Sequence, residues 1–160
     1  ARVLAHRPNT YFLIAGSGDM ERQIVEEAAY RRIAERVLFA GFVRGEERDA
    51  LYRAADVYVM PSVSEPFGIT ALEALMHGVP TIISKQSGVR EISSHMLLTD
   101  FWDIDELANK IIAVLDHRAL AATLREHSIK DVLRATWDRT AEKCLAMYHD
   151  LIQQPAIVTA

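Results

Sequence analysis

The stretch DVYVMPSVSEPFGITALEALMHGVPTIIS, residues 56–84, decides the fold because it contains two short apolar runs with a helical segment between them. We expect strands at Asp56–Met60 and Thr81–Ser84, since each is a short apolar run bounded by turn residues. A helix is expected at Ile69–His77, because the Gly-Val-Pro that follows it is a common stop signal. A strand, a helix and a strand in direct succession indicate a βαβ unit with parallel strands.

The rest of the chain repeats this alternation. We expect further strands at 10–16, 37–43 and 96–100. We expect a helix tail at 1–6 and helices at 19–36 (capped by Asp19), 46–55, 89–93, 103–116, 119–127 and 137–153. The strand candidates are continuously apolar, which is typical of strands buried on both faces. The predicted fold class is therefore α/β, a Rossmann-like parallel sheet with helices on both faces, whose ligands bind beyond the carboxyl ends of the strands.

The bulk composition excludes several classes of protein. The 160 residues suit one domain, and the net charge of −4 provides no basic field for nucleic acid. Cys144 has no second cysteine to pair with, which fits a reducing compartment. We see no signal peptide and no apolar run of about 18 residues, so no transmembrane segment is expected. The chain opens on a helix tail feeding a strand, so we expect its first residue to be a cut within a domain.

Other site types fit the sequence poorly. The segment AGSGDM (Ala15–Met20) resembles a dinucleotide fingerprint, but it lacks the third glycine, and a plain glycine turn into a helix explains it as well. A receiver domain would need an acidic residue at the end of the strand Asp56–Met60, where Met60, Pro61 and Ser62 stand instead. The histidines have no metal-ligand spacing, so we expect no metal site.

Two carboxylates, Glu65 and Glu73, flank the start of the central helix, and two interpretations stay open. Thr70 and Glu73 have the spacing of a capping box, in which each side chain bonds to the other residue's backbone amide. That interpretation leaves Glu65 and the Pro66–Gly68 segment unexplained. The second interpretation is a ligand site, in which free amides at a helix start face an anion and a carboxylate grips neighbouring hydroxyls.

The segment MPSVSEPFGITALEALMHGVPTIIS resembles the donor-binding segment of the retaining, family-four glycosyltransferases of the GT-B fold. Their hallmark is two glutamates separated by seven residues, here Glu65 and Glu73. The resemblance extends, in order, through FLIAGSGD, RVLFAGFVRGEERDALYRAADVYVMPS, GVPTIIS, SGVRE, ELANKIIAVL and TWDRTAEKCLAMYHDL. It covers nearly the whole chain and only the C-terminal, nucleotide-sugar-binding half of such enzymes.

The resemblance implies a role for each matching residue. Glu65 matches the catalytic glutamate beside the transferred sugar, and Glu73 matches the one that grips the ribose. The remaining expected donor-binding residues lie in the sheet-edge loops and at the start of the central helix: Gly16, Gly18, Phe42, Val43, Arg44, Ser62, Phe67, Gly68, Ile69 and Thr70. Of these, the segment Phe42–Arg44 borders the base, and the segment Phe67–Thr70 faces the sugar and diphosphate.

The chain departs from the family pattern in two places. The family's Arg and Lys for the diphosphate lie after a first strand that has no counterpart here, and the segment after SGVRE is shorter than usual. We therefore expect residues 1–160 to form a single donor-binding domain without its first strand and without the N-terminal acceptor domain, inactive as a fragment. The implied partners are a UDP-, ADP- or GDP-linked sugar and a hydroxyl acceptor, with no cofactor or metal, in the cytoplasm or peripherally at a membrane. The alternative is a non-catalytic nucleotide-binding or partner-docking module.

Overall fold

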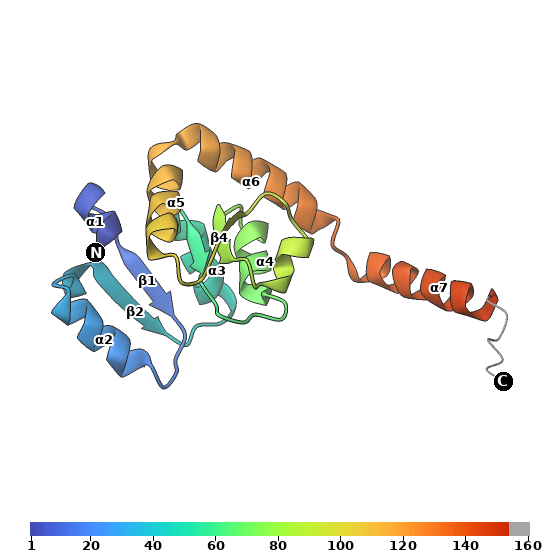
Figure 1. Cartoon of the computed structure of the whole chain (residues 1–160), viewed down its shortest axis with the longest axis horizontal. Helices are drawn as coiled ribbons and strands as arrows, with labels where there is room; N and C mark the ends of the chain where they lie inside the picture. The colour runs from blue at the N-terminus through green and yellow to red at the C-terminus, as the bar shows by residue number, and fades with distance from the viewer. Residues whose placement is uncertain (154–160) are drawn as a thin grey trace.

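The computed structural model describes residues 1–153, in which helices and parallel strands alternate (Figure 1). The strands are β1 Phe12–Ala15, β2 Val37–Gly41, β3 Tyr58–Met60, β4 Thr81–Ser84 and β5 Leu97–Thr99. The α-helices are α1 Arg2–His6, α2 Glu21–Tyr30, α3 Gly45–Ala54, α4 Ile69–Met76, α5 Ile104–Asp116, α6 Arg118–Leu133 and α7 Trp137–Gln153. Two short 3-10 helices, η1 Ala34–Arg36 and η2 Gly88–Glu91, complete the set. The α/β fold class is confirmed.

The strands form two hydrogen-bonded groups within the described residues, where one sheet was expected. β1 pairs with β2, and β3, β4 and β5 pair in that order, with every pairing parallel. The pair β1–β2 lies beside the three-stranded group (Figure 1). Phe12 of β1 and Val59 of β3 both pack against the buried cluster that contains Ile82 of β4, so the two groups share a core without sharing backbone hydrogen bonds.

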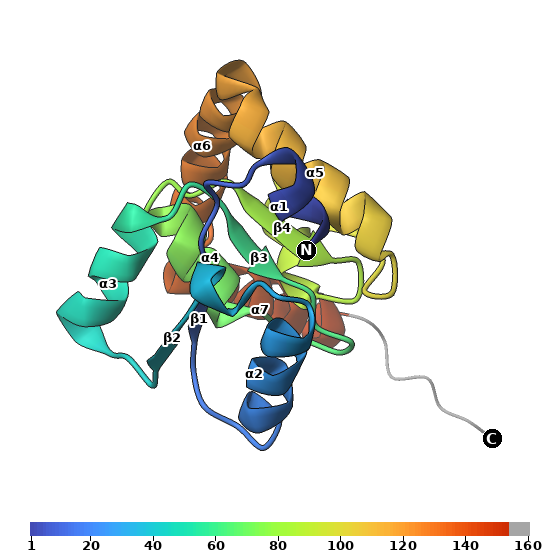
Figure 2. The same cartoon turned by 90° about the vertical axis from the view of Figure 1, so that its left-hand side faces the viewer.

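The middle strand β4 is covered on both faces. Ile82 packs in a cluster with residues of α1, α5 and α6, and Ile83 packs in a cluster with residues of α4 and η2. In Figure 2, α1 and α5 lie on one side of β3 and β4, and α4 lies on the other. Both isoleucines have no exposed surface, and burial of each contributes about 1.5–3 kcal/mol. Helices therefore cover both faces of this group, as the continuously apolar run predicts.

The strands β1 and β2 are not buried on both faces, so the expectation of buried strands is wrong there. Leu13, Leu38 and Phe39 keep 45%, 50% and 37% of their surface exposed. Leu13 and Leu38 are partners across the two strands, whereas Phe39, the next residue of β2, points to the opposite face, so exposed apolar side chains lie on both faces. Such exposure is unusual for a parallel sheet. This surface is therefore available for a further element to cover.

The helix α2 is shorter than predicted and lacks the predicted cap. It begins after Met20, with no side-chain hydrogen bond at its start, so Asp19 is not its N-cap. It ends at Tyr30, because Arg32 adopts a left-handed conformation with φ 56° and a separate 3-10 turn then leads into β2. Left-handed residues at this position are a common way to end a helix.

Two further helices differ from the predicted ranges. The helix expected at 119–127 runs from Arg118 to Leu133, because Ser128 is fully buried and Val132 packs in the same cluster as Ile83. The helix expected at 89–93 is the 3-10 turn η2. The other predicted helices match within about two residues.

The helix α7 projects away from the other elements (Figure 1) and buries none of its residues. No helix in the described part of the chain is both long enough and apolar enough to cross a membrane.

Candidate functional site

The N-terminus of α4 is an uncapped helix start beyond the end of β3. Its N-cap is Gly68, which has φ 103° and provides no side chain to cap the helix. The amides of Ala71 and Leu72 donate to the Gly68 carbonyl at 3.1 and 3.2 Å. The amides of Ile69 and Thr70 have no hydrogen-bond partner within residues 1–153, as expected for the first turn of a helix. This helix start is suited to an anion.

The capping-box interpretation of Thr70 and Glu73 is wrong. The helix begins at Ile69, so Thr70 already lies inside its first turn. Its hydroxyl accepts a hydrogen bond from the Tyr58 hydroxyl at 2.8 Å and donates weakly to the Met60 sulfur at 3.6 Å. Tertiary partners from β3 therefore take the side chain that the sequence pattern assigns to the cap.

Glu73 is held by two residues of α3. Its carboxylate accepts hydrogen bonds from the Arg48 guanidinium at 2.6 Å and from the Tyr52 hydroxyl at 3.2 Å. Arg48 also bonds to Asp49, and this hydrogen bond raises the pKa of Arg48 and lowers that of Asp49. No motif in the sequence marks Arg48 and Tyr52 as partners of Glu73, although their spacing of four residues places both on one helix face.

The pKa of Tyr52 predicts how the stability of the fold changes at alkaline pH. Burial, together with Tyr58 and Glu73, raises its pKa well above the ordinary 10. The folded protein therefore binds the phenolic proton more tightly than the unfolded chain does. This contribution to stability is complete below pH 10 and is lost as the pH rises further.

An ultraviolet titration of tyrosinate tests this prediction. We expect Tyr52→Phe to remove one late-titrating phenol from the folded protein, because burial raises the pKa of Tyr52. An unchanged late-titrating fraction in Tyr52→Phe would contradict the assignment.

Glu65 lies in the loop between β3 and α4, where the sequence places it. Its carboxylate is half-buried and accepts one weak hydrogen bond, from the Phe67 amide at 3.3 Å. It forms no ion pair with any residue between 1 and 153. The carboxylate is therefore available for a ligand on this side of the domain.

A second loop is fixed against the Glu65 segment. The Gly88 amide donates to the Glu65 carbonyl at 3.0 Å, and Glu65 and Ser87 form an isolated parallel bridge. A Cβ on Gly88 would lie only 2.2 Å from the Pro66 carbonyl oxygen, so the approach of the two backbones requires glycine.

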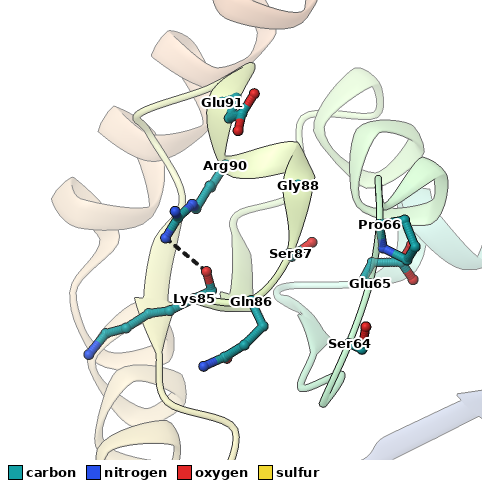
Figure 3. A pocket seen from close by; sticks show the side chains of 9 residues that line it. All are labelled: Ser64, Glu65, Pro66, Lys85, Gln86, Ser87, Gly88, Arg90 and Glu91. Carbon is teal, nitrogen blue, oxygen red and sulfur yellow. Dashed lines mark hydrogen bonds between the residues drawn. The ribbon is translucent and has the colours of Figure 1, made fainter.

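A cavity of about 250 Å³ lies between these two segments (Figure 3). Its lining residues come from the β3–α4 loop and from the segment after β4: Ser64, Glu65, Pro66, Lys85, Gln86, Ser87, Gly88, Arg90 and Glu91. Lys85 pairs with Asp100 at 2.7 Å, and Arg90 donates to the Lys85 carbonyl at 2.9 Å. The lining thus combines hydrogen-bond donors with carboxylate acceptors.

The other predicted donor-binding residues lie outside this cavity. Gly16 follows β1 and donates its amide to the Gly41 carbonyl at 2.6 Å. Gly18 lines a different cavity, beside α2. Arg44 lies over the ring of Phe42, 4.6 Å from its centroid, in the loop after β2 that also contains Val43.

The predicted residues around α4 lie closer together. Ser62 is half-buried in the loop that leads to α4, and Phe67 and Ile69 flank Gly68 with 47% and 64% of their surfaces exposed. The structure therefore groups the residues around α4 with Glu65 and leaves the residues after β1 and β2 separate. Among the residues that the structure describes, no cluster of three or more His, Cys, Asp or Glu side chains could hold a metal ion.

Comparisons with solved structures identify the fold. The sucrose-phosphate synthase from Thermosynechococcus elongatus superposes with a TM-score of 0.78 at 30% identity, over 94% of this chain and 40% of that one. HepE of Anabaena in complex with UDP-glucose superposes with a TM-score of 0.78 at 23% identity, over 92% of this chain and 43% of that one. The fold is thus that of the GT-B glycosyltransferases.

Sequence comparisons identify the family. An uncharacterized glycosyltransferase of Methanocaldococcus jannaschii is 36% identical over 151 residues, which are 91% of this chain and 38% of that protein. The chain therefore spans well under half the length of the relatives it matches. The family model described as "Glycosyl transferases group 1" matches residues 1–131. The chain belongs to the glycosyl transferases group 1 family.

Proposed function

We propose that this chain is the donor-binding domain of a retaining hexosyltransferase that transfers a sugar from a nucleotide sugar to a hydroxyl acceptor. The observation that carries the proposal is the uncapped start of α4 beside the Glu65 cavity. Among the superposed structures, HepE was solved with UDP-glucose bound, which supports a nucleotide sugar as the ligand class. A titration with UDP, ADP and GDP that follows the backbone amides of Gly68, Ile69 and Thr70 tests the proposal directly.

In this proposal the α4 N-terminus receives the diphosphate. The free amides of Ile69 and Thr70 and the positive end of the helix dipole converge there. Gly68 lets the backbone approach the ligand closely, and its φ of 103° strains any other residue. The donor is a substrate, and the proposal adds no metal or other cofactor.

The two glutamates have separate roles. Glu73 grips two ribose hydroxyls, since a carboxylate is a good acceptor for a pair of neighbouring donors. Arg48 and Tyr52 already orient its carboxylate, so it is preorganised for that task. Glu65 faces the sugar and stabilises the positive charge that develops at the anomeric carbon as the diphosphate leaves.

The open edges of the two strand groups leave a place for one further strand. β1 and β3 each have one edge without a paired strand in the described residues. One further parallel strand between them would give the doubly wound order β2-β1-strand-β3-β4-β5. We propose that a segment outside this sequence supplies that strand, and that an acceptor-binding domain completes the active site. The 160-residue chain alone is then inactive in transfer.

We further propose that the protein is located in the cytoplasm. The single cysteine, Cys144, is exposed and unpaired, and such a thiol fits a reducing compartment.

Glu73→Gln will weaken nucleotide binding more than it weakens the fold. Glutamine keeps the shape of the side chain but loses the charge-assisted bonds to the ribose, which lowers affinity by about tenfold or more. Asp49 still pairs with Arg48 in the variant, so the guanidinium keeps one partner.

Calorimetric titration with UDP, ADP and GDP measures this effect, and Glu47→Gln, on the exposed side of α3, serves as the control. A Glu73→Gln variant with the affinity of the parent would show that Glu73 serves the fold alone.

A further inference from the structure

The hydroxyl group of Ser87 is buried and has no hydrogen-bond partner. Ser87 keeps only 1% of its surface exposed, and its Oγ is one of two buried side-chain oxygens without a partner among the described residues. The other belongs to Ser84, at the end of β4. A buried polar group without a hydrogen-bond partner lowers the stability of the fold. A ligand that forms the missing hydrogen bond explains why such a group is present.

The surrounding backbone fixes this hydroxyl beside the start of α4. Ser87 bridges to Glu65, and the following residue, Gly88, bonds to the Glu65 carbonyl. A Cβ built on Gly68 would lie 3.2 Å from the Ser87 Oγ, which places the oxygen next to the N-cap of α4. Ser87 lines the cavity, and Figure 3 shows its oxygen on the side that faces Glu65 and Pro66.

We propose that Ser87 is a donor-binding residue whose hydroxyl donates a hydrogen bond to a phosphate oxygen of the nucleotide sugar. The inference rests on the proposed function and extends it to a residue outside the matching glutamate motif. The bond pairs the buried hydroxyl with the ligand that occupies the helix start.

The chemistry around Ser87 favours phosphate over the sugar as its partner. The amides of Ile69 and Thr70 are free donors at the same helix start, so three donors and the helix dipole meet there. Such a set binds an oxyanion, because an anion accepts several hydrogen bonds at once. The carboxylate of Glu65 accepts only the weak hydrogen bond from the Phe67 amide, so in this proposal it serves the sugar and the Ser87 hydroxyl serves the phosphate.

Ser87→Ala, compared with Ser84→Ala, tests the inference. Both variants remove a buried hydroxyl that has no partner, so we expect neither to lower the melting temperature. Ser84 does not line the cavity, so its variant serves as the matched control. Binding is measured by calorimetry with whichever pair the parent binds most tightly: UDP and UDP-glucose, ADP and ADP-glucose, or GDP and GDP-mannose.

We expect Ser87→Ala to lower the affinity for both members of that pair by the same factor, about three- to tenfold, with Ser84→Ala equal to the parent. If the parent binds a pair and Ser87→Ala binds it equally well, the role of Ser87 is refuted and the proposed function stands. A loss confined to the sugar-linked member, or an equal loss in Ser84→Ala, also refutes the phosphate contact. If the parent binds none of the six compounds, the proposed function and this inference both fail.

Discussion

Glu65→Gln, in a form of the protein that includes the acceptor-binding part, will lower turnover about a hundredfold or more. Its affinity for the bare nucleoside diphosphate will change by less than about twofold. The carboxylate faces the cavity with only a weak backbone bond, so its interaction with the sugar strengthens as positive charge develops. Only interactions that are stronger in the transition state accelerate the chemistry. Removing one such electrostatic contact typically costs 10²–10³ in rate.

The control for this variant is Glu91→Gln, which changes a carboxylate of η2 that also lines the cavity. Thermal unfolding should show a change within about 0.5 kcal/mol for Glu65→Gln, as for other positions without ion pairs. Turnover equal to that of the parent would show that Glu65 has no part in the chemistry.

Gly88→Ala will separate the two segments that form the cavity. The new Cβ would lie 2.2 Å from the Pro66 carbonyl oxygen and 3.1 Å from its carbonyl carbon, and neither backbone atom can rotate away. The loops must therefore move apart, which breaks the bridge between Glu65 and Ser87. We expect a destabilisation of about 1–3 kcal/mol, as for other overpacked sites. Nucleotide-sugar affinity should fall at least tenfold.

Denaturant unfolding measures the stability effect, with Gly18→Ala as the control for stability alone, because a Cβ there meets nothing within 4 Å. Calorimetric titration measures the loss of affinity. If Gly88→Ala is as stable as the parent and binds a nucleotide sugar equally well, the fixed contact between the loops is not needed for the site.

Local signals in the sequence predict the β3–α4–β4 unit well. Pro61, Gly78 and Pro80 interrupt the pattern at the right places, and β4 has the predicted bounds Thr81–Ser84. The division of the five strands into two hydrogen-bonded groups depends on pairing between distant segments, which a local pattern does not encode. The apolar runs of β1 and β2 predict burial on both faces, but the structure leaves Leu13 half-exposed.

The candidate site is predictable where one loop contains it. Glu65, Gly68 and Glu73 lie around α4 as their spacing indicates. The cap at Thr70 fails because the Tyr58 hydroxyl competes for its side chain, and this contact joins residues twelve positions apart. Ser87 has no distinguishing pattern in the sequence, and only the folded structure shows that its hydroxyl is buried without a partner.

A nuclear magnetic resonance titration of the backbone amides with UDP, ADP and GDP tests the central claim most directly. The claim is that the start of α4 binds the diphosphate of a nucleotide. We predict saturable shifts at the amides of Gly68, Ile69 and Thr70 with at least one of the three, and none at these amides with the corresponding nucleoside. Saturable binding whose shifts lie away from α4, or no binding of any of the three, would contradict the account.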